Sequence, residues 1–268
     1  MTVGMLALII FAVFLTQVSV VALGGLYRRK RQYREIDVQA SEPQILSGSR
    51  QLVHSSPDAA RVPPASREGF SEFSVQRREI EDENSFICSF YLLPIDGLPL
   101  PSFRPGQFLT FRLPIEDAVT HQPKTVVRCY SLSDRPHPDY YRISIKRVPA
   151  PTDQPEAPPG LSSNFFHDRV QKGTTLMVKA PSGHFHLMED EQLPIVLVGG
   201  GIGITPMLSI VNSLLEAGSQ REIWLFYGVR NGAEQIMKEQ LRELARVHGN
   251  FHLHVCYSNP HEGDVAGV

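Results

Sequence analysis

A glycine-rich turn between an apolar run and an amphipathic segment is the feature that most restricts how this 268-residue chain can fold. Residues 195–199 form a continuous apolar run, which predicts a buried parallel strand. Residues 207–217 carry leucine and valine at helical spacing, and Gly218 stands where glycine commonly ends a helix. Thr205 and Pro206 are predicted to be the N-cap and the first residue of that helix. The sequence here therefore predicts a strand, a turn and a helix.

The turn has the composition of a phosphate-binding site, because its residues from Gly199 to Pro206 read GGGIGITP. Glycine lets the backbone approach a pyrophosphate closely, and the free amides at a helix N-terminus favour negative charge. The spacing does not match G-x-G-x-x-G: the sixth residue is Ile204 when counted from Gly199 and Pro206 when counted from Gly201. We therefore expect a nucleotide-binding turn of a different geometry.

The pattern that follows extends this unit to half of a doubly wound α/β sheet. Residues 223–227 and 251–257 are predicted strands, and residues 233–247 are a predicted helix between them. Ligands of such sheets bind at the carboxyl ends of the strands, where the glycine-rich turn and Arg230 both lie. Arg230 could contact a nucleotide phosphate or ribose there, or be an ordinary surface arginine, and its position favours neither alternative.

The preceding part of the chain has the pattern of a small antiparallel β-barrel. Short alternating segments, separated by turn residues and with little helix between them, are typical of such barrels. The predicted strands are residues 72–80, 85–93, 107–113, 125–132, 140–148 and 175–180.

One predicted strand of the barrel ends with Arg128-Cys129-Tyr130-Ser131. A guanidinium can bind a phosphate through two hydrogen bonds, an aromatic ring can stack on an isoalloxazine, and a hydroxyl can hydrogen-bond a ring nitrogen. These residue types within four positions would suit a flavin. The alternative is an exposed strand end without a ligand.

A second candidate phosphate site is the sequence GLSSN at residues 160–164, which opens a predicted helix over residues 165–170. Serine or asparagine at a helix start can cap free backbone amides, and the same amides can bind a phosphate. Plain helix capping is the simpler interpretation of this segment.

The N-terminal part of the chain has the features of a membrane anchor. Residues 3–23 contain no charged residue and are numerous enough to cross a bilayer as a helix. A basic flank of Arg28, Arg29, Lys30, Arg31 and Arg34 follows, which places the remaining chain in the cytoplasm by the positive-inside rule. A cleaved signal peptide is the alternative, but it would have a basic start and a shorter apolar core. Residues 35–69 are rich in Ser, Pro, Gln, Ala and Arg and are predicted to be a flexible linker.

Composition excludes several other classes. A formal net charge of −2 and the lack of a basic stripe argue against a nucleic-acid partner. The three cysteines, Cys88, Cys129 and Cys256, are too scattered for an iron–sulfur cluster or a disulfide framework, and they favour a reducing compartment. No acidic or cysteine partner at ligand spacing accompanies His184 and His186, so no metal site is predicted.

The order Arg-x-Tyr-Ser, Gly-x-x-Ser and Gly-Gly-x-Gly-x-Thr-Pro resembles the ferredoxin–NADP reductase family over about residues 70–259. The resemblance is greatest to its flavohaemoglobin-type and ring-hydroxylating-oxygenase-type reductase modules. It implies an enzyme that passes electrons from NAD(P)H through FAD to a redox partner, such as an iron–sulfur protein. With the predicted anchor, this would be a single-pass protein of the inner membrane with its catalytic part in the cytoplasm.

The resemblance implies a role for each quoted residue. Arg128 would bind the flavin pyrophosphate, Tyr130 would lie against the isoalloxazine, and Ser131 would hydrogen-bond near flavin N5, so Tyr130 and Ser131 are the predicted catalytic residues. Further flavin contacts are predicted for Ile145, Lys146 and Arg147 on the next strand. The predicted pyrophosphate site is Gly160, Leu161, Ser162 and Ser163. The predicted nicotinamide-nucleotide site is Gly200, Gly201, Gly203, Thr205, Pro206 and Arg230.

The sequence departs from the family at its C-terminal side. Family members continue to a strand that ends in Cys-Gly-Pro, which this sequence does not contain before Val268. The expected organisation is an anchor and basic flank (1–34), a linker (35–69), an FAD-binding barrel (70–189) and an incomplete NAD(P)-binding α/β domain (190–268). The alternative function is a membrane-tethered flavin-binding module without full reductase activity.

Overall fold

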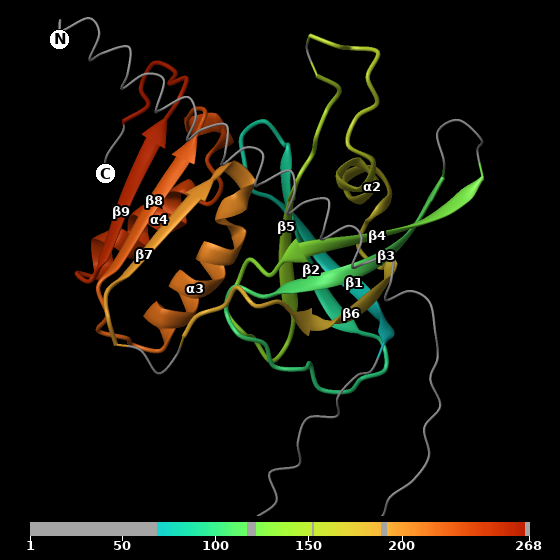
Figure 1. Ribbon diagram of the computed structural model, residues 1–268, viewed down its shortest axis with the longest axis horizontal. Helices are drawn as coiled ribbons and strands as arrows, with labels where there is room; N and C mark the ends of the chain where they lie inside the picture. Colours follow the sequence, from blue (N-terminus) through green and yellow to red (C-terminus); the bar gives the residue numbers. More distant parts are fainter. Residues whose placement is uncertain (1–68, 117–121, 152, 189–191, 266–268) are drawn as a thin grey trace, which may run out of the picture. The chain divides into compact units, whose positions relative to one another are not determined.

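The computed structural model of the chain describes residues 69–116, 122–151, 153–188 and 192–265 (Figure 1). The predicted anchor at residues 3–23, its basic flank and the linker lie outside the described residues. Within the described part of the chain, no helix has both the length and the apolar character needed to span a bilayer.

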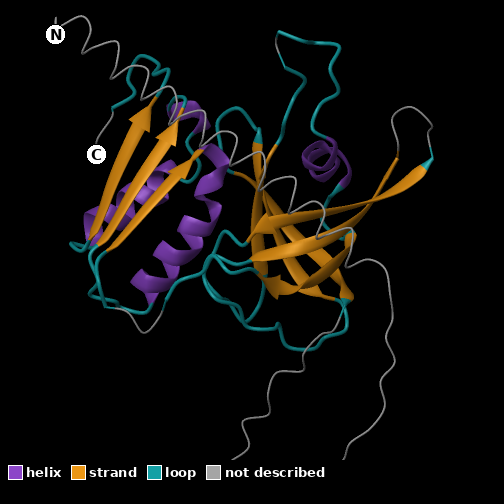
Figure 2. Ribbon diagram, viewed as in Figure 1, coloured by secondary structure: helices purple, strands orange, loops and turns teal. Residues whose placement is uncertain are grey.

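The first layer is a six-stranded antiparallel sheet with the order β4-β3-β6-β1-β2-β5. It curls into a half-barrel, and its two edge strands approach at a single bridge between Leu132 and Ile143 (Figure 2). The strands are β1 Phe70–Ile80, β2 Ile87–Pro94, β3 Phe108–Glu116, β4 Pro123–Ser131, β5 Tyr141–Lys146 and β6 Thr175–Ser182. The predicted antiparallel sheet is thus confirmed, with β1 and β2 as its first hairpin.

Alternating burial explains why a segment such as β3 is a strand, whereas β2 and β5 are buried along most of their length. In β3, Leu109, Phe111, Leu113 and Ile115 point into the barrel while the residues between them face outward. Helix α2, Leu161–Arg169, closes one end of this core. Its Phe166 is fully buried and lies edge-on to three aromatic rings, with centroids 5.1 to 5.4 Å away, which belong to Phe90, Phe111 and Tyr130.

The second layer is a parallel three-stranded sheet with the order β7-β8-β9. Its elements are β7 Ile195–Gly200, the 3-10 turn η1 Gly201–Ile204, α3 Thr205–Glu216, β8 Ile223–Val229, the 3-10 turn η2 Gly232–Glu234, α4 Lys238–Val247 and β9 Phe251–Tyr257. The predicted β-α-β-α-β order is confirmed. Alternate strand residues such as Leu197, Leu225 and Leu253 pack with Leu208 and Leu241 of the helices.

The predicted burial of the β7 strand is only half correct. Val196 and Val198 are 62% and 68% exposed, so only every second side chain of this strand is buried among the described residues. The predicted Thr205 cap is wrong. The chain already turns through η1, Ile204 precedes the helix, and the Thr205 hydroxyl donates to the Ile202 carbonyl at 3.1 Å instead of capping an amide.

The predicted starts of two other helices are also wrong. Helix α2 begins at Leu161, four residues earlier than predicted, and Gly160 precedes it without any side-chain cap. Helix α4 begins at Lys238 rather than at residue 233, because Met237 has a left-handed φ of 51° that separates it from η2.

Candidate functional site

Strand β4 presents Arg128 and Tyr130 on one face, because successive strand side chains alternate. The Arg128 side chain is exposed, and among the described residues its guanidinium donates only a local hydrogen bond, 2.8 Å long, to the Val127 carbonyl. Most of its five N–H donors are therefore available to an anion. Ser131 faces the other way at the end of the strand and is half-buried.

The Tyr130 ring is fixed from behind by the aromatic core. It lies edge-on to Phe111 and Phe166 with centroid distances of 5.8 and 5.1 Å. Burial raises the pKa of Tyr130 to about 12, although the charge of Arg128 and the hydroxyl of Ser162 oppose the shift. The phenol is therefore protonated at neutral pH, and a half-buried ring held on one side can accept a flat partner on the other.

Ser162, in the first turn of α2, is a buried hydroxyl that lacks a partner. The residue is 6% exposed, and its oxygen meets no described group in good hydrogen-bond geometry, although it lies near enough to the Tyr130 phenol to lower the pKa of that group. A buried polar group without a partner costs about 1–3 kcal/mol, so such a group is typical of a ligand site. The first amides of α2 also lack intrahelical acceptors. An anionic group would satisfy both.

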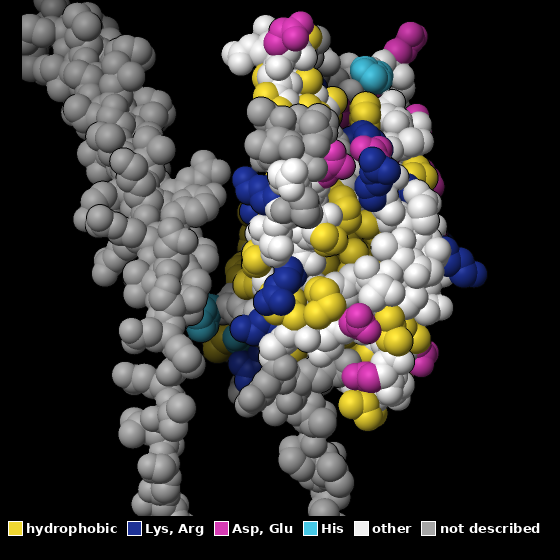
Figure 3. All heavy atoms as spheres, turned by 90° about the vertical axis from the view of Figure 1, so that its right-hand side faces the viewer, with side chains coloured by type: hydrophobic (Ala, Val, Ile, Leu, Met, Phe, Trp, Pro, Cys, Tyr) yellow, Lys and Arg dark blue, Asp and Glu magenta, His cyan; other side chains and the backbone are white. Residues whose placement is uncertain are grey.

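The neighbouring predicted residues have mostly structural roles. The Ser163 hydroxyl donates to the Gly160 carbonyl at 3.3 Å, and the Leu161 side chain is exposed. A Cβ on Gly160 would lie 2.6 Å from the Ser163 hydroxyl oxygen and 2.8 Å from the Val148 Cβ, so only glycine fits there. Seen from the right-hand side of Figure 1, the surface carries Lys and Arg side chains intermixed with apolar and acidic ones (Figure 3).

The predicted flavin contacts Ile145, Lys146 and Arg147 lie at the end of β5 and directly after it. Ile145 is 2% exposed and packs in the barrel core, so its side chain cannot reach a ligand, and its carbonyl accepts a hydrogen bond from His167 Nε2 at 2.9 Å. Arg147 forms an ion pair with Asp168 at 2.5 Å. Lys146 extends toward the second sheet, where its ammonium pairs with Glu234 at 2.6 Å.

The buried position of His167 predicts that the stability of the barrel depends on pH. Burial lowers the pKa of His167, although the Ile145 carbonyl favours its charged form. Below the ordinary pKa of about 6.5, the unfolded chain binds a proton before the folded chain does, so the free energy of unfolding falls with falling pH. Between pH 7.5 and 5.5, the free energy of unfolding of wild type should fall by about 1 kcal/mol more than that of His167→Gln. Urea titrations at the two pH values measure this difference. His184→Gln, at an exposed histidine, should keep the wild-type slope; equal slopes for all three proteins would contradict the prediction.

A cavity of about 440 Å³ lies at the carboxyl ends of β7, β8 and β9, where ligands of parallel sheets bind. It is lined by Lys146, Gly201, Gly228, Val229, Arg230, Glu234, Cys256, Tyr257 and Ser258. Of the predicted nucleotide residues, Gly201 and Arg230 therefore line the cavity. Gly200, Gly203, Thr205 and Pro206 are not part of its lining, although they build the adjoining turn.

Glu234 is the one acidic residue in this lining, and it was not predicted. Its carboxylate accepts from Lys146 at 2.6 Å and from Arg230 at 2.8 Å. Burial alone would raise the pKa of Glu234, but the hydrogen bonds and charges of the two cations outweigh it and hold the pKa below its usual value. The Asn231 side chain accepts from the Glu234 amide at 3.2 Å and fixes the turn that carries it.

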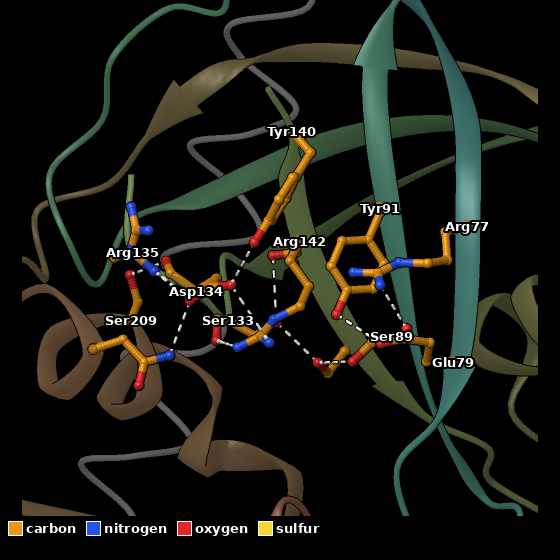
Figure 4. A network of polar contacts seen from close by, with 12 residues as sticks. Arg77, Glu79, Ser89, Tyr91, Ser133, Asp134, Arg135, Tyr140, Arg142 and Ser209 are labelled. Atoms are coloured by element: carbon orange, nitrogen blue, oxygen red, sulfur yellow. Dashed lines mark hydrogen bonds and ion pairs between the residues drawn. The ribbon is translucent and has the colours of Figure 1, made fainter. Parts of the chain in front are cut away.

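Asp134, three residues after Ser131, joins the end of β4 to helix α3 (Figure 4). Its carboxylate pairs with Arg142 at 3.4 Å and accepts from Asn212 at 2.9 Å, and its carbonyl accepts from the Ser209 hydroxyl at 2.7 Å. Arg142 is buried and also donates to the Ser133 carbonyl. This network fixes Ser131 relative to the helix that follows the glycine-rich turn.

Comparisons with known proteins agree with this geometry. Residues 197–267 match the family model described as an oxidoreductase NAD-binding domain. Flavohemoproteins of Halalkalibacterium halodurans and of Bacillus cereus strain ATCC 10987 are 39% and 41% identical to the chain. These matches cover 77% and 68% of this chain and 48% and 44% of the relatives, so the chain spans about half the length of these curated relatives.

Two solved structures are similar. The FAD/NAD-binding domain of a nitric oxide dioxygenase from Vibrio cholerae is 28% identical, with a TM-score of 0.63 over 74% of this chain and 78% of that one. Phthalate dioxygenase reductase is 27% identical, with a TM-score of 0.55 over 73% of this chain and 55% of that one.

Proposed function

We propose that this chain, which belongs to the ferredoxin reductase-like family of FAD- and NAD-dependent oxidoreductases, carries electrons from NAD(P)H through FAD to a redox partner. The chemistry supplied by bound FAD is acceptance of a hydride from NAD(P)H and release of its two electrons singly. The residues of the chain bind and orient the two cofactors. The single observation that carries the proposal is the buried, unpartnered Ser162 hydroxyl beside Tyr130.

The residues of the half-barrel fit a flavin nucleotide. Arg128 would bind the pyrophosphate with its free N–H donors, and the Ser162 hydroxyl and the first amides of α2 would complete that site. Tyr130 would stack on the isoalloxazine with the face that the aromatic core leaves open, and Ser131 would hydrogen-bond near flavin N5. The nicotinamide nucleotide would occupy the cavity at the ends of β7 to β9.

The electron acceptor is proposed from the similar proteins. Flavohemoproteins are by name flavin and haem proteins, and the phthalate dioxygenase reductase is described as a modular structure for electron transfer from pyridine nucleotides to [2Fe-2S]. A haem or iron–sulfur protein, or a domain of that kind, would serve as the acceptor for this chain.

The test is flavin reduction by the full chain, purified in a mild detergent. We expect a yellow protein with absorbance near that of FAD, which NADH or NADPH bleaches under anaerobic conditions. A colourless protein that takes up no added FAD would refute the proposal. Bound flavin that neither nucleotide bleaches would favour the alternative, a flavin-binding module without reductase activity.

Residues 3–23 would anchor the protein in the cytoplasmic membrane, with the basic flank and the flavin site on the cytoplasmic side. The support is the uncharged segment and the basic residues that follow it. The full chain should then sediment with membranes after a carbonate wash, whereas a variant that lacks residues 1–34 should remain in the supernatant. Equal sedimentation of the two would remove the anchor from the proposal.

A further inference from the structure

Three buried hydroxyl groups form a chain from strand β2 to the residues just after β4. The Ser89 oxygen lies 2.7 Å from that of Ser144 on β5, which in turn lies 2.8 Å from the Ser133 oxygen. Each of the three residues is at most 4% exposed. Arg142 Nε donates to the Ser133 hydroxyl at 3.3 Å, and the same guanidinium pairs with Asp134 at 3.4 Å (Figure 4). The hydroxyls therefore extend the Asp134 network, which reaches α3, back to strand β2.

Glu81 lies at the other end of this chain, in the turn between β1 and β2. Its Oε1 atom is buried and has no hydrogen-bond partner among the described residues. Burial raises the pKa of Glu81, although the Ser89 hydroxyl and the charge of Arg142 favour its charged form. The carboxyl group is thus close enough to respond to both, and the three hydroxyls connect it to the guanidinium.

The other titratable groups that face Glu81 do not give it a cation of its own within the part of the chain that the structure describes. Arg77 and Glu79 of β1 pair with each other at 2.8 Å, and they act on the pKa of Glu81 in opposite directions. The Cys88 thiol is buried, and burial raises its pKa, so it is uncharged at neutral pH. The remaining cation is the buried guanidinium at the far end of the hydroxyl chain, which already has a carboxylate partner.

We propose that proton uptake by Glu81 strengthens the contact between the half-barrel and helix α3, so that this contact depends on pH. With Glu81 charged, Arg142 serves two carboxylates: Asp134 directly, and Glu81 through hydroxyls that can all donate toward it. With Glu81 neutral, the Ser133 hydroxyl can donate to the Arg142 carbonyl at 3.3 Å instead, and the guanidinium serves Asp134 alone. Asp134 carries the hydrogen bonds to α3, and α3 begins at the glycine-rich turn. The effect would therefore extend to that turn.

Proton uptake by Glu81 should also stabilise the folded chain. A carboxyl group whose pKa is higher in the folded chain than in the unfolded one binds its proton first in the folded state. The free energy of unfolding then rises as the pH falls through the raised pKa toward the ordinary value of about 4.3, and this contribution is lost as the pH rises. His167 acts with the opposite sign, so each variant must be compared with wild type at the same pH.

The first measurement is thermal unfolding of the full chain in detergent at pH 8 and pH 5. Glu81→Gln removes the charge and keeps the shape of the side chain. It should melt about 2–4 °C above wild type at pH 8, and the difference should shrink toward zero at pH 5. Glu83→Gln is the matched control, because it removes the same charge from an exposed residue of the same turn. It should melt with wild type at both pH values.

The second measurement is hydrogen exchange of α3, corrected for the intrinsic effect of pH on exchange. Helix α4 is the internal reference, because its ion pairs lie within the helix. In wild type, the protection of α3 relative to α4 should rise about fivefold or more from pH 8 to pH 5. In Glu81→Gln, the ratio should already be high at pH 8 and should not change with pH.

Ser144→Ala tests whether the hydroxyls carry the effect, and it also serves if Glu81→Gln does not fold. It interrupts the chain but keeps Glu81, so the α3 ratio should no longer depend on pH. A wild-type response of α3 in Ser144→Ala would overturn the proposal. So would a ratio in wild type that does not change with pH, or melting of Glu81→Gln together with Glu83→Gln at pH 8.

Discussion

Replacing Arg128 with alanine is expected to release most of the bound flavin while the fold stays intact. In the proposed site, the guanidinium would bind the FAD pyrophosphate, and a charge-assisted hydrogen bond of this kind contributes about 1.5–3 kcal/mol. The affinity for FAD should therefore fall roughly 10- to 100-fold. Because the side chain is exposed and bonds only its neighbour's carbonyl, the free energy of unfolding should change by less than about 0.5 kcal/mol.

The measurement is a titration of the apoprotein with FAD, followed by the quenching of flavin fluorescence. Arg128→Lys separates charge from shape: it should recover part of the affinity, because an ammonium keeps the charge but loses the planar fork. Lys124→Ala, which removes another exposed cation from the same strand, is the matched control. If Arg128→Ala binds FAD as tightly as Lys124→Ala does, the pyrophosphate lies elsewhere.

A strand such as β3 could be predicted from the sequence because only one of its faces is buried. Every second residue of β3 is apolar, and this local pattern predicts which side chains face the core. The observed β3 agrees, because the buried side chains are Leu109, Phe111, Leu113 and Ile115. The start of α2 could not be predicted in this way. Serine is a residue type that often caps a helix, but α2 begins at Leu161 after an uncapped Gly160, and Ser162 lies inside its first turn with a buried hydroxyl.

The charged residues of the nucleotide cavity show a different limit. Lys146 and Glu234 are 88 positions apart and meet only because two separate sheets come together. No periodicity relates them, so the sequence led to a flavin role for Lys146 and to no role for Glu234. Arg230 could be placed at the cavity because the end of a parallel strand is a local feature. The same distinction applies to Asp134, whose partners Arg142 and Asn212 come from two different layers.

The second large effect is expected at that network, where Asp134→Ala should destabilise the protein by about 2–4 kcal/mol. The substitution removes the carboxylate that pairs with the buried Arg142, which keeps its bonds to Ser133, and it removes the acceptor of Asn212. The Tyr140 hydroxyl loses its acceptor as well, at 3.2 Å. Thermal unfolding should shift down by roughly 5–10 °C in a chain of this size.

Asp139→Ala is the matched control for this change, because Asp139 lies in the same loop, is exposed and, within the part of the chain that the structure describes, forms an ion pair only with His137 at 3.6 Å. It should melt within about 1 °C of wild type. The network also predicts an effect on the reaction. The bonds of Asp134 to Asn212 fix the end of β4 against α3, and α3 begins at the glycine-rich turn. In stopped-flow experiments, Asp134→Ala should therefore lower the rate constant of flavin reduction by NADH by a larger factor than it lowers the affinity for FAD. If Asp134→Ala and Asp139→Ala melt at the same temperature, the Asp134 carboxylate stabilises the protein no more than an exposed charge does. The two layers must then be held by their apolar contacts.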